Sequence, residues 1–237
     1  MYQYYISFDD TDNLDTLGTG HLLQDFLDEQ PYESTFISRH QLFVHTDVPY
    51  TSHNSAMCAL VSEKADFEQL IKAASEYLRK HAAEGSDPGL CVADCKKMLH
   101  QEELVKWGYS AKKEVLQKSE AYELAKVCKI HLSEHGGTGQ GIVGALAAVG
   151  LRISGNDGRI KGKKQVSKSI LSVGELLEET GFDRVCAYGI GQLPKETMVS
   201  VEDNFVKAIY QNYCRTVLTV FEDHSYHLLK KEQLKCY

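Results

Sequence analysis

Three aspartates near the start of the chain, Asp9, Asp10 and Asp12, lie within a span of four residues. At neutral pH such carboxylates repel one another unless a cation lies among them, and magnesium binds a few carboxylates together with phosphate oxygens. The aspartates follow YQYYISF, an aromatic and β-branched segment that predicts a strand ending at the cluster. This pattern favours a metal site at the end of a strand. The alternative is a group of turn and capping residues, because aspartate is frequent in turns.

A second candidate is the glycine-rich segment HGGTGQGIVGALAAVG, His135 to Gly150, which runs into small apolar residues typical of a packed helix. Glycines just before a helix leave backbone amides unscreened, and the positive end of the helix favours phosphate. The segment lacks the Gly-Lys-Ser/Thr of a P-loop and the full spacing of a dinucleotide fingerprint, so a flexible loop before a packing helix is the alternative. The candidate phosphate-binding residues are Gly136, Gly137, Thr138, Gly139, Gln140 and Gly141.

Together the two segments predict a nucleoside triphosphate site, because such a site consists of a carboxylate cluster for a cation and a loop for the phosphates. Hydrophobic spacing predicts the elements that position them. These are a strand at 2–8, a helix at 18–30, strands at 34–45 and 55–63, a helix at 66–85 and a strand at 87–94. This order predicts an α+β, two-layer fold with a ferredoxin-like βαββαβ pattern, in which an antiparallel sheet carries both helices on one face.

The rest of the chain adds further α/β elements. Its pattern predicts a helical segment at 96–132 broken at Gly108, a strand, turn and strand within 151–162, and a final strand at 216–221. We therefore expect a catalytic region at 1–164 and a C-terminal α/β lobe at 165–237, which either stands alone or belongs to the same domain.

Composition limits the function classes. A net charge of −7 argues against broad, non-specific binding of nucleic acid. One basic stretch, GRIKGKKQVSK at 158–168, is either a solvated loop or a contact for RNA or polyphosphate. Seven scattered cysteines, with no signal peptide and no membrane-spanning segment, predict a cytoplasmic protein with free thiols and no membrane partner.

The sequence resembles the catalytic, kinase-like region of the archaeal tRNA(Ile) 2-agmatinylcytidine synthetases. The matching motifs are FDDTDNLDTLGTG, SRHQLFVHTDVPYTSHNSA, DPGL and GTGQGIVGALAAVG, in the family's order and within residues 5 to 160. That family uses ATP to activate an oxygen of a tRNA cytidine by phosphoryl transfer, after which agmatine displaces the phosphate.

The resemblance implies roles for individual residues. Asp9, Asp10 and Asp12 would hold Mg²⁺ and orient ATP, and Gly137 to Gly141 would line the phosphates. Thr19 matches the threonine that family members phosphorylate on themselves, and a helix N-cap is the alternative.

The second motif supplies three further candidates. Asn54 is expected in the cofactor site. Arg39 and His53 would stabilise charge that develops on the transferred phosphoryl group, with a structural role as the alternative for each.

The chain also departs from the family. The archaeal enzymes continue into an oligonucleotide-binding barrel and a zinc ribbon, for which no pair of CxxC motifs is present here. Where the family loop tends to read PYKTRGN, this chain has PYTSHNS and less positive charge.

We therefore expect a magnesium-dependent, ATP-binding phosphotransferase or ligase-like enzyme. Its acceptor is a small molecule or a nucleotide, with tRNA less favoured. The alternatives are a non-catalytic nucleotide-binding regulatory module and an RNA-binding accessory protein. The sequence leaves the oligomeric state open.

Overall fold

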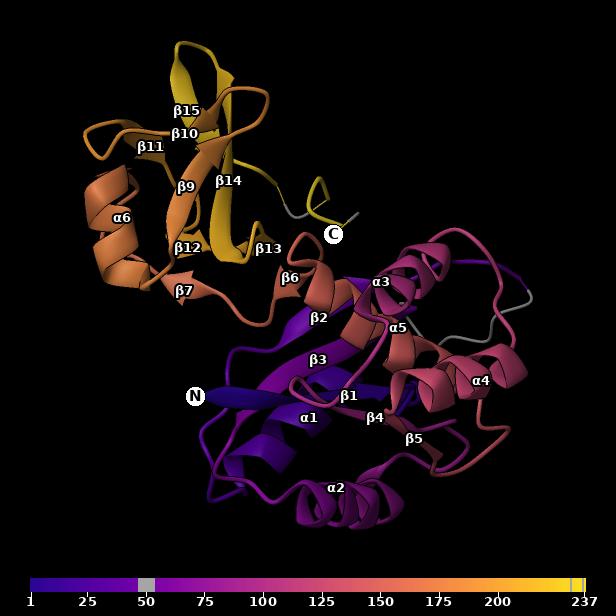
Figure 1. Cartoon of the computed structure of the whole chain (residues 1–237). Helices are drawn as coiled ribbons and strands as arrows, with labels where there is room; N and C mark the ends of the chain where they lie inside the picture. The colour runs from indigo at the N-terminus through magenta and orange to yellow at the C-terminus, as the bar shows by residue number, and fades with distance from the viewer. Residues whose placement is uncertain (47–53, 231, 236) are drawn as a thin grey trace. The chain divides into compact units, whose positions relative to one another are not determined.

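The computed structural model describes residues 1–46, 54–230, 232–235 and 237. The chain divides into two compact units, Met1–Ser154 and Gly155–Tyr237, coloured from indigo to orange and from orange to yellow in Figure 1. The sequence predicted a boundary after residue 164, and the observed division falls earlier, after Ser154. No described helix has the length and apolar character that crossing a membrane requires.

The described part of the first unit is built on an antiparallel sheet with the strand order β5-β4-β1-β3-β2. The strands are β1 (Tyr2–Asp9), β2 (Ser38–Gln41), β3 (Ser55–Ser62), β4 (Gly89–Asp94) and β5 (His131–Glu134). The central strand is β1, in which Ile6 pairs with Ala59 on one side and with Val92 on the other.

Helices cover both faces of this sheet (Figure 1). They are α1 (Thr19–Asp28), α2 (Phe67–His81), α3 (Gln101–Ser110), α4 (Lys118–Cys128) and α5 (Gly141–Ser154). The alternation of β1 explains the layers, because successive side chains of a strand point to opposite faces. Tyr4, Ile6 and Phe8 pack into the core with α1 and α2, whereas Tyr5 packs into the core with α3, α4 and α5.

The predicted α+β class is confirmed, and the expected two-layer arrangement is extended by the third layer of α3, α4 and α5. The predicted break at Gly108 is wrong, because α3 continues to Ser110 and the interruption falls between α3 and α4. A β-carbon on Gly108 would lie 2.8 Å from Cγ of Leu151, so this glycine serves the packing of α3 on α5.

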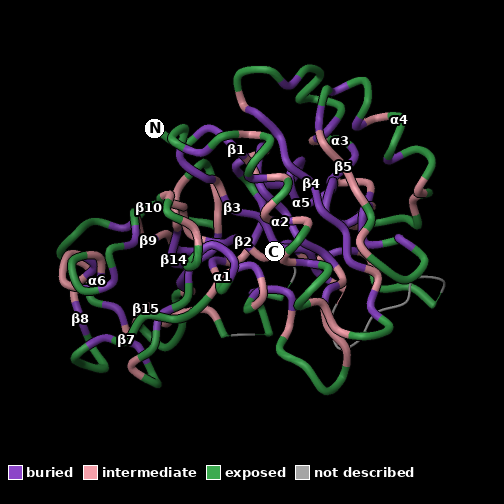
Figure 2. The backbone as a smooth tube through the Cα atoms, turned by 90° about the horizontal axis from the view of Figure 1, so that it is seen from below, coloured by how far each residue is buried: buried purple, intermediate pink, exposed green. Residues whose placement is uncertain are grey.

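Helix α5 lies against β1, β3 and β4 and is buried on almost every side (Figure 2). A helix that is apolar all round belongs inside a protein, which agrees with the small-residue sequence IVGALAAVG. The strand predicted to begin at Leu151 is wrong, because α5 extends to Ser154. Burial of the helix on nearly all sides outweighs any local preference of this short stretch for a strand.

The second unit is mainly a sheet in the order β6-β13-β14-β15-β11-β8, in which β9 pairs in parallel with β14 and β10 pairs with β9. A separate pair joins β7 to β12. The short strands are β6 (Arg159–Ile160), β7 (Lys164–Gln165), β8 (Ile170–Ser172), β9 (Arg184–Ala187), β10 (Gly191–Gln192), β11 (Met198–Ser200), β12 (Phe205–Val206), β13 (Ile209–Gln211) and β15 (Ser225–Leu228).

The longer elements of this unit agree with the sequence pattern. Strand β14 (Cys214–Glu222) contains the final strand predicted at 216–221. Helix α6 (Val173–Thr180) begins with a capping box, in which Ser172 accepts the Glu175 amide and the Glu175 carboxylate accepts the Ser172 amide.

Candidate functional site

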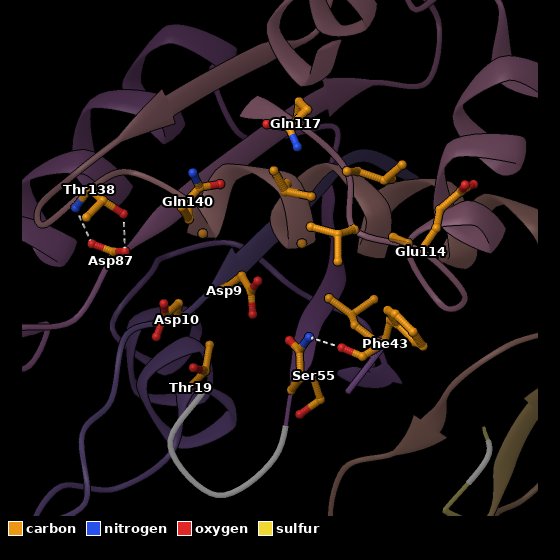
Figure 3. Close-up of a pocket in the computed structure, with 18 of the residues that line it drawn as sticks. Asp9, Asp10, Thr19, Phe43, Ser55, Asp87, Glu114, Gln117, Thr138 and Gln140 are labelled. Carbon is orange, nitrogen blue, oxygen red and sulfur yellow. Dashed lines mark hydrogen bonds between the residues drawn. The ribbon is translucent and has the colours of Figure 1, made fainter. Parts of the chain in front are cut away.

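A cavity of about 530 Å³ lies in the first unit, at the end of β1 (Figure 3). It brings together residues that the sequence analysis took from segments far apart in the chain. Among these candidates, the residues that line the cavity are Asp9, Asp10, Asp12, Thr19, Asn54, Thr138, Gln140 and Gly141. In Figure 3, Asp9, Asp10 and Asp87 lie toward one end of the cavity, and Phe43 and Glu114 lie toward the other.

Asp9, the last residue of β1, has a nearly buried side chain with 7% of its surface exposed. Its carboxylate lies against the first turn of α5, where a β-carbon on Gly144 would overlap Oδ2 of Asp9. Burial raises the pKa of Asp9 well above its usual range, and the neighbouring charge of Asp10 raises it further. A nearby cation would offset both effects by favouring the ionised carboxylate.

Asp10 follows directly and has a positive φ of 49°, which turns the chain out of the strand. Its pKa is raised to about 6, first by burial and then by the charges of Asp87 and Asp12. The carboxylates of Asp87 and Asp12 thus lie close enough to Asp10 to raise its pKa. In the described ranges, however, no three His, Cys, Asp or Glu side chains are grouped as the ligands of a metal ion. A cation here would need other oxygens as well, and phosphate supplies them for magnesium.

Asp12 and Thr19 join the acidic turn to α1. Oδ1 of Asp12 accepts hydrogen bonds from the Thr19 amide at 3.1 Å and from the Thr19 hydroxyl at 2.8 Å. The Thr19 oxygen accepts in turn from the hydroxyl of Thr11 at 3.1 Å. The N-cap alternative for Thr19 is wrong, because the N-cap of α1 is Gly18 and Thr19 is the first helical residue. Thr19 is also one of the residues that line the cavity.

The glycine segment forms the turn between β5 and α5. Thr138 donates its amide and its hydroxyl to the carboxylate of Asp87 (Figure 3). The Gly141 amide donates to the carbonyl of Asp87 at 3.2 Å, and the Val143 amide donates to the carbonyl of Gln140 at 3.0 Å. Two of the amides that the sequence analysis assigned to phosphate, those of Thr138 and Gly141, thus have protein partners. Gly136, Gly137 and Gly139 are not among the described lining residues.

The second motif contributes less directly. Nδ2 of Asn54 donates to the carbonyl of Phe43 at 2.6 Å, which ties one wall of the cavity together. Arg39 lies on β2 and is outside the lining set, and its Nε donates to Oγ of the lining residue Ser55 at 2.9 Å. The expectation for His53 falls outside the residues that the structure describes.

Sequence reasoning missed part of the wall. Asp87 was noted only as the first residue of DPGL, although an aspartate directly before a predicted strand was a usable signal. Glu114 and Gln117 come from the segment between α3 and α4, which the sequence assigned to one interrupted helix. Gly144 lies in the apolar part of the glycine segment, where no polar pattern marks a site.

The described lining is strongly acidic. Its charged side chains are all carboxylates, namely Asp9, Asp10, Asp12, Asp87 and Glu114. Such a cavity disfavours a free polyanion and favours a ligand that brings cations with it.

Neither a protein-family model nor a curated protein matches this sequence. Solved structures do match. That of TiaS in complex with an isoleucine tRNA and ATP has a TM-score of 0.55 and 27% identity, covering 63% of this chain and 36% of that one. The chain has a TiaS-like fold over this length. A tRNA fluorescent labelling enzyme gives a TM-score of 0.55 and 28% identity, over 62% of this chain and 36% of that one.

A further structure, that of TiaS without ligands, is described as an agmatidine synthetase acting on an isoleucine tRNA. It gives a TM-score of 0.52 and 25% identity, over 62% of this chain and 35% of that one. The chain therefore spans about a third of the length of the solved structures that it matches.

Proposed function

We propose that this chain is a magnesium-dependent, ATP-binding phosphotransferase or ligase-like enzyme related to TiaS. The observation that carries the proposal is the meeting of the acidic turn, Asp9 to Asp12, with the start of α5 in one cavity. Phosphoryl transfer requires chiefly orientation of the phosphates and neutralisation of their charge. An acidic cavity beside the positive end of a helix supplies sites for the cation and for the phosphates.

Asp9, Asp10 and Asp12 are the residues proposed to hold magnesium. When bound, the ion would neutralise the triphosphate and offset the repulsion among these carboxylates. Gln140 and Gly141 face the cavity at the start of α5 and are proposed to lie near the phosphates. Of the remainder of the segment, Thr138 lines the cavity, and Gly136, Gly137 and Gly139 are outside its described lining.

The fold agrees with this assignment. The strand order β4-β1-β3-β2, with α1 and α2 on one face, supports a ferredoxin-like core in which β1 is central. A central strand delivers its last residues to a rigid position, and here these residues are Phe8 and Asp9.

The acceptor is proposed to be a small molecule or a nucleotide, with tRNA as the second choice. One of the matching TiaS structures is a complex with an isoleucine tRNA and ATP. The described lining also includes the apolar side chains of Leu42, Phe43 and Val115, which are proposed to contact the acceptor.

Calorimetric titration with a non-hydrolysable ATP analogue, with and without magnesium, tests the proposal. We expect binding that requires magnesium and that falls by at least about tenfold in Asp9→Asn, because one cation ligand is lost. Glu76→Gln is the matched control, since Glu76 is an acid on α2 that does not line the cavity. Wild-type protein that binds no analogue under any condition would contradict the proposal. Binding without turnover of any tested acceptor would favour the regulatory module.

A further inference from the structure

The second unit contains a two-stranded ribbon in which residues 159–166 run antiparallel to residues 204–210. Strand β6 pairs with β13 toward one end of this ribbon, and β7 pairs with β12 toward the other (Figure 1). Between the two pairs, the Ile160 amide donates to the carbonyl of Ala208 at 2.8 Å. The ribbon therefore joins the basic stretch noted in the sequence to a segment much later in the chain.

A bulge interrupts the pairing on the side of the basic stretch. Beyond the hydrogen bond of Ile160, the next paired residues are Lys164 and Val206. The three residues 161–163 thus lie opposite Lys207 alone, which is the arrangement of a bulged strand. The central glycine of these three has a φ of 90°, in the region that favours glycine. The bulge brings the lysines at its two ends to the part of the ribbon that holds Lys207.

The ribbon carries positive charge without carboxylates of its own. Neither residues 158–168 nor residues 204–210 include an aspartate or a glutamate, although the whole chain has a net charge of −7. Lys168 forms an ion pair with Glu175 at 3.1 Å and is thereby partly neutralised. The other lysines of the ribbon are exposed or half-buried, namely Lys161, Lys163, Lys164 and Lys207. Neighbouring like charges add their fields, so this surface attracts anions although the net charge of the protein repels them.

An aromatic ring lies among these lysines. Phe205 pairs with Gln165 across the ribbon and keeps 37% of its surface exposed. The Nζ atom of Lys163 lies 3.5 Å from the centroid of the Phe205 ring, an arrangement in which the cation and the ring attract each other. Two exposed acids, Glu202 and Asp203, precede this strand and mark the end of the basic surface. Phe205 thus presents part of an aromatic ring directly beside positive charge.

The combination of lysines with an exposed aromatic ring fits one class of polyanion. Lysines bind the phosphates of any nucleic acid, and aromatic side chains stack on bases whose faces are open, as they are in a single strand. A duplex covers those faces, and an inorganic polyphosphate or a lipid headgroup has no planar ring to stack.

We propose that this ribbon binds single-stranded nucleic acid, with its lysines on the phosphates and Phe205 on a base. The surface belongs to the second unit, so the inference does not rest on the nucleotide site proposed in the first. RNA and DNA strands share the phosphates and bases on which the proposal depends, and the experiment compares them.

Fluorescence anisotropy of labelled oligonucleotides with the full-length protein tests the proposal. The probes are a single RNA strand of about 12 nucleotides, the same sequence as DNA, and the corresponding duplex, each titrated over a salt series. One variant removes three lysines of the ribbon, Lys161→Gln/Lys163→Gln/Lys164→Gln. Its matched control removes three exposed lysines of the first unit, Lys72→Gln/Lys80→Gln/Lys126→Gln.

A second pair of variants tests the ring. Phe205→Leu removes the aromatic surface and keeps an apolar side chain. Phe221→Leu is its control, since Phe221 is an exposed aromatic residue of β14 in the same unit. Circular dichroism verifies the fold of every variant, and calorimetry measures its affinity for the non-hydrolysable ATP analogue with magnesium.

The two kinds of variant should differ in their dependence on salt. The ribbon triple variant should lose about tenfold or more in affinity for the single strand at low salt. Its plot of log affinity against log salt concentration should become shallower by about 2, because each phosphate contact contributes about 0.7 to that slope. Phe205→Leu should weaken binding by about fivefold or more with an unchanged slope, because stacking on a base is not ionic. Both controls should bind the strand as wild type does.

Other outcomes overturn the proposal. If the duplex binds as tightly as the single strand, or Phe205→Leu binds as wild type does, the ribbon attracts polyanions without recognising a base. If both triple variants lose the same affinity, the strand is not bound at the ribbon. Wild-type protein that binds the ATP analogue but neither single strand overturns this inference and leaves the proposed function standing. The reverse result overturns the proposed function alone.

Discussion

Gly144 of α5 and Asp9 of β1 are in contact at the wall of the cavity, so closely that a β-carbon on Gly144 would overlap Oδ2 of Asp9. The glycine therefore leaves the space in which the buried carboxylate lies. It also places Asp9 beside the first turn of α5, where the partial positive charge of the helix is concentrated.

Gly144→Ala is expected to displace the Asp9 carboxylate. Magnesium-dependent binding of the ATP analogue should fall by about tenfold or more, since a shift of about 1 Å disrupts a ligand set. Calorimetry measures the affinity, and circular dichroism verifies the fold. Gly18→Ala is the control near the same cavity, because a β-carbon there meets only Oδ2 of Asp12 at 3.9 Å. Unchanged affinity in Gly144→Ala would show that Asp9 is not needed where it lies.

Gly150→Ala is expected to affect stability instead of binding. A β-carbon on Gly150 would overlap the carbonyl oxygen of Leu104, so α3 and α5 would have to separate. Overpacking of this kind destabilises by about 1–3 kcal/mol. Urea unfolding gives the difference. Gly174→Ala on α6 is the matched helical control, since its closest neighbour would lie at 3.5 Å, and it should be neutral or stabilising. Equal stability of the two variants would contradict the close packing.

Thr19→Val tests the hydrogen bonds between the acidic turn and α1. Thr19 is only 4% exposed. Replacing its hydroxyl by a methyl group removes the hydrogen bond that Thr19 donates to Asp12 and the one that it accepts from Thr11. We expect a loss of about 1–3 kcal/mol in the free energy of unfolding. Thr19→Ser should recover most of the lost free energy of unfolding.

A further expectation follows from the proposed relation to TiaS, namely that labelled phosphate from ATP is found on Thr19 and is absent from Thr19→Val.

The pH dependence of stability should include a contribution from His135. Burial lowers the pKa of His135 from 6.5 to about 4, and the charges of Arg79 and His131 act in the same direction. Between these two values the unfolded chain binds the proton more strongly than the folded chain. Stability therefore falls as the pH falls from 6.5 to about 4 and is not lowered further by this group below that range.

His135→Asn isolates this contribution from those of the aspartates. Because His135 is only half-buried, the effect is roughly 1 kcal/mol after allowance for solvent screening. Urea unfolding at pH values of about 7.5, 5.5 and 4 should show a smaller decrease for the variant than for wild type. If the stability of the two proteins falls equally with pH, the assignment of this pH dependence to His135 is wrong.

Local sequence signals predicted the first unit well where one face of an element dominates. The strand before Asp9 and the amphipathic helix ending near His81 follow from alternation and from a clear N-cap at Asp66, whose side chain accepts the Gln69 amide. The errors fall where tertiary packing overrides local preference. Leu151 continues α5 because that helix is enclosed on all sides, a condition that no local window contains.

The candidate site was predictable in outline, because its acidic turn and its glycine loop each have a recognisable composition. Their partners were not. Asp87 lies far from Thr138 in the chain and becomes significant only when β4 and the loop after β5 meet. Gln117 reaches the cavity through the orientation of a helix start, which depends on how α3 and α4 pack.

The acidic lining of the cavity has a consequence for how the protein behaves in any buffer. Within the described ranges, five carboxylates and no lysine or arginine line it, so mobile ions must compensate the field inside. Sodium, potassium and organic amines would then compete for the cavity with the magnesium ion that we propose. The magnesium concentration needed for the proposed nucleotide binding should therefore rise with ionic strength. Polyamines should weaken nucleotide binding at low magnesium, and this effect should disappear as magnesium is raised.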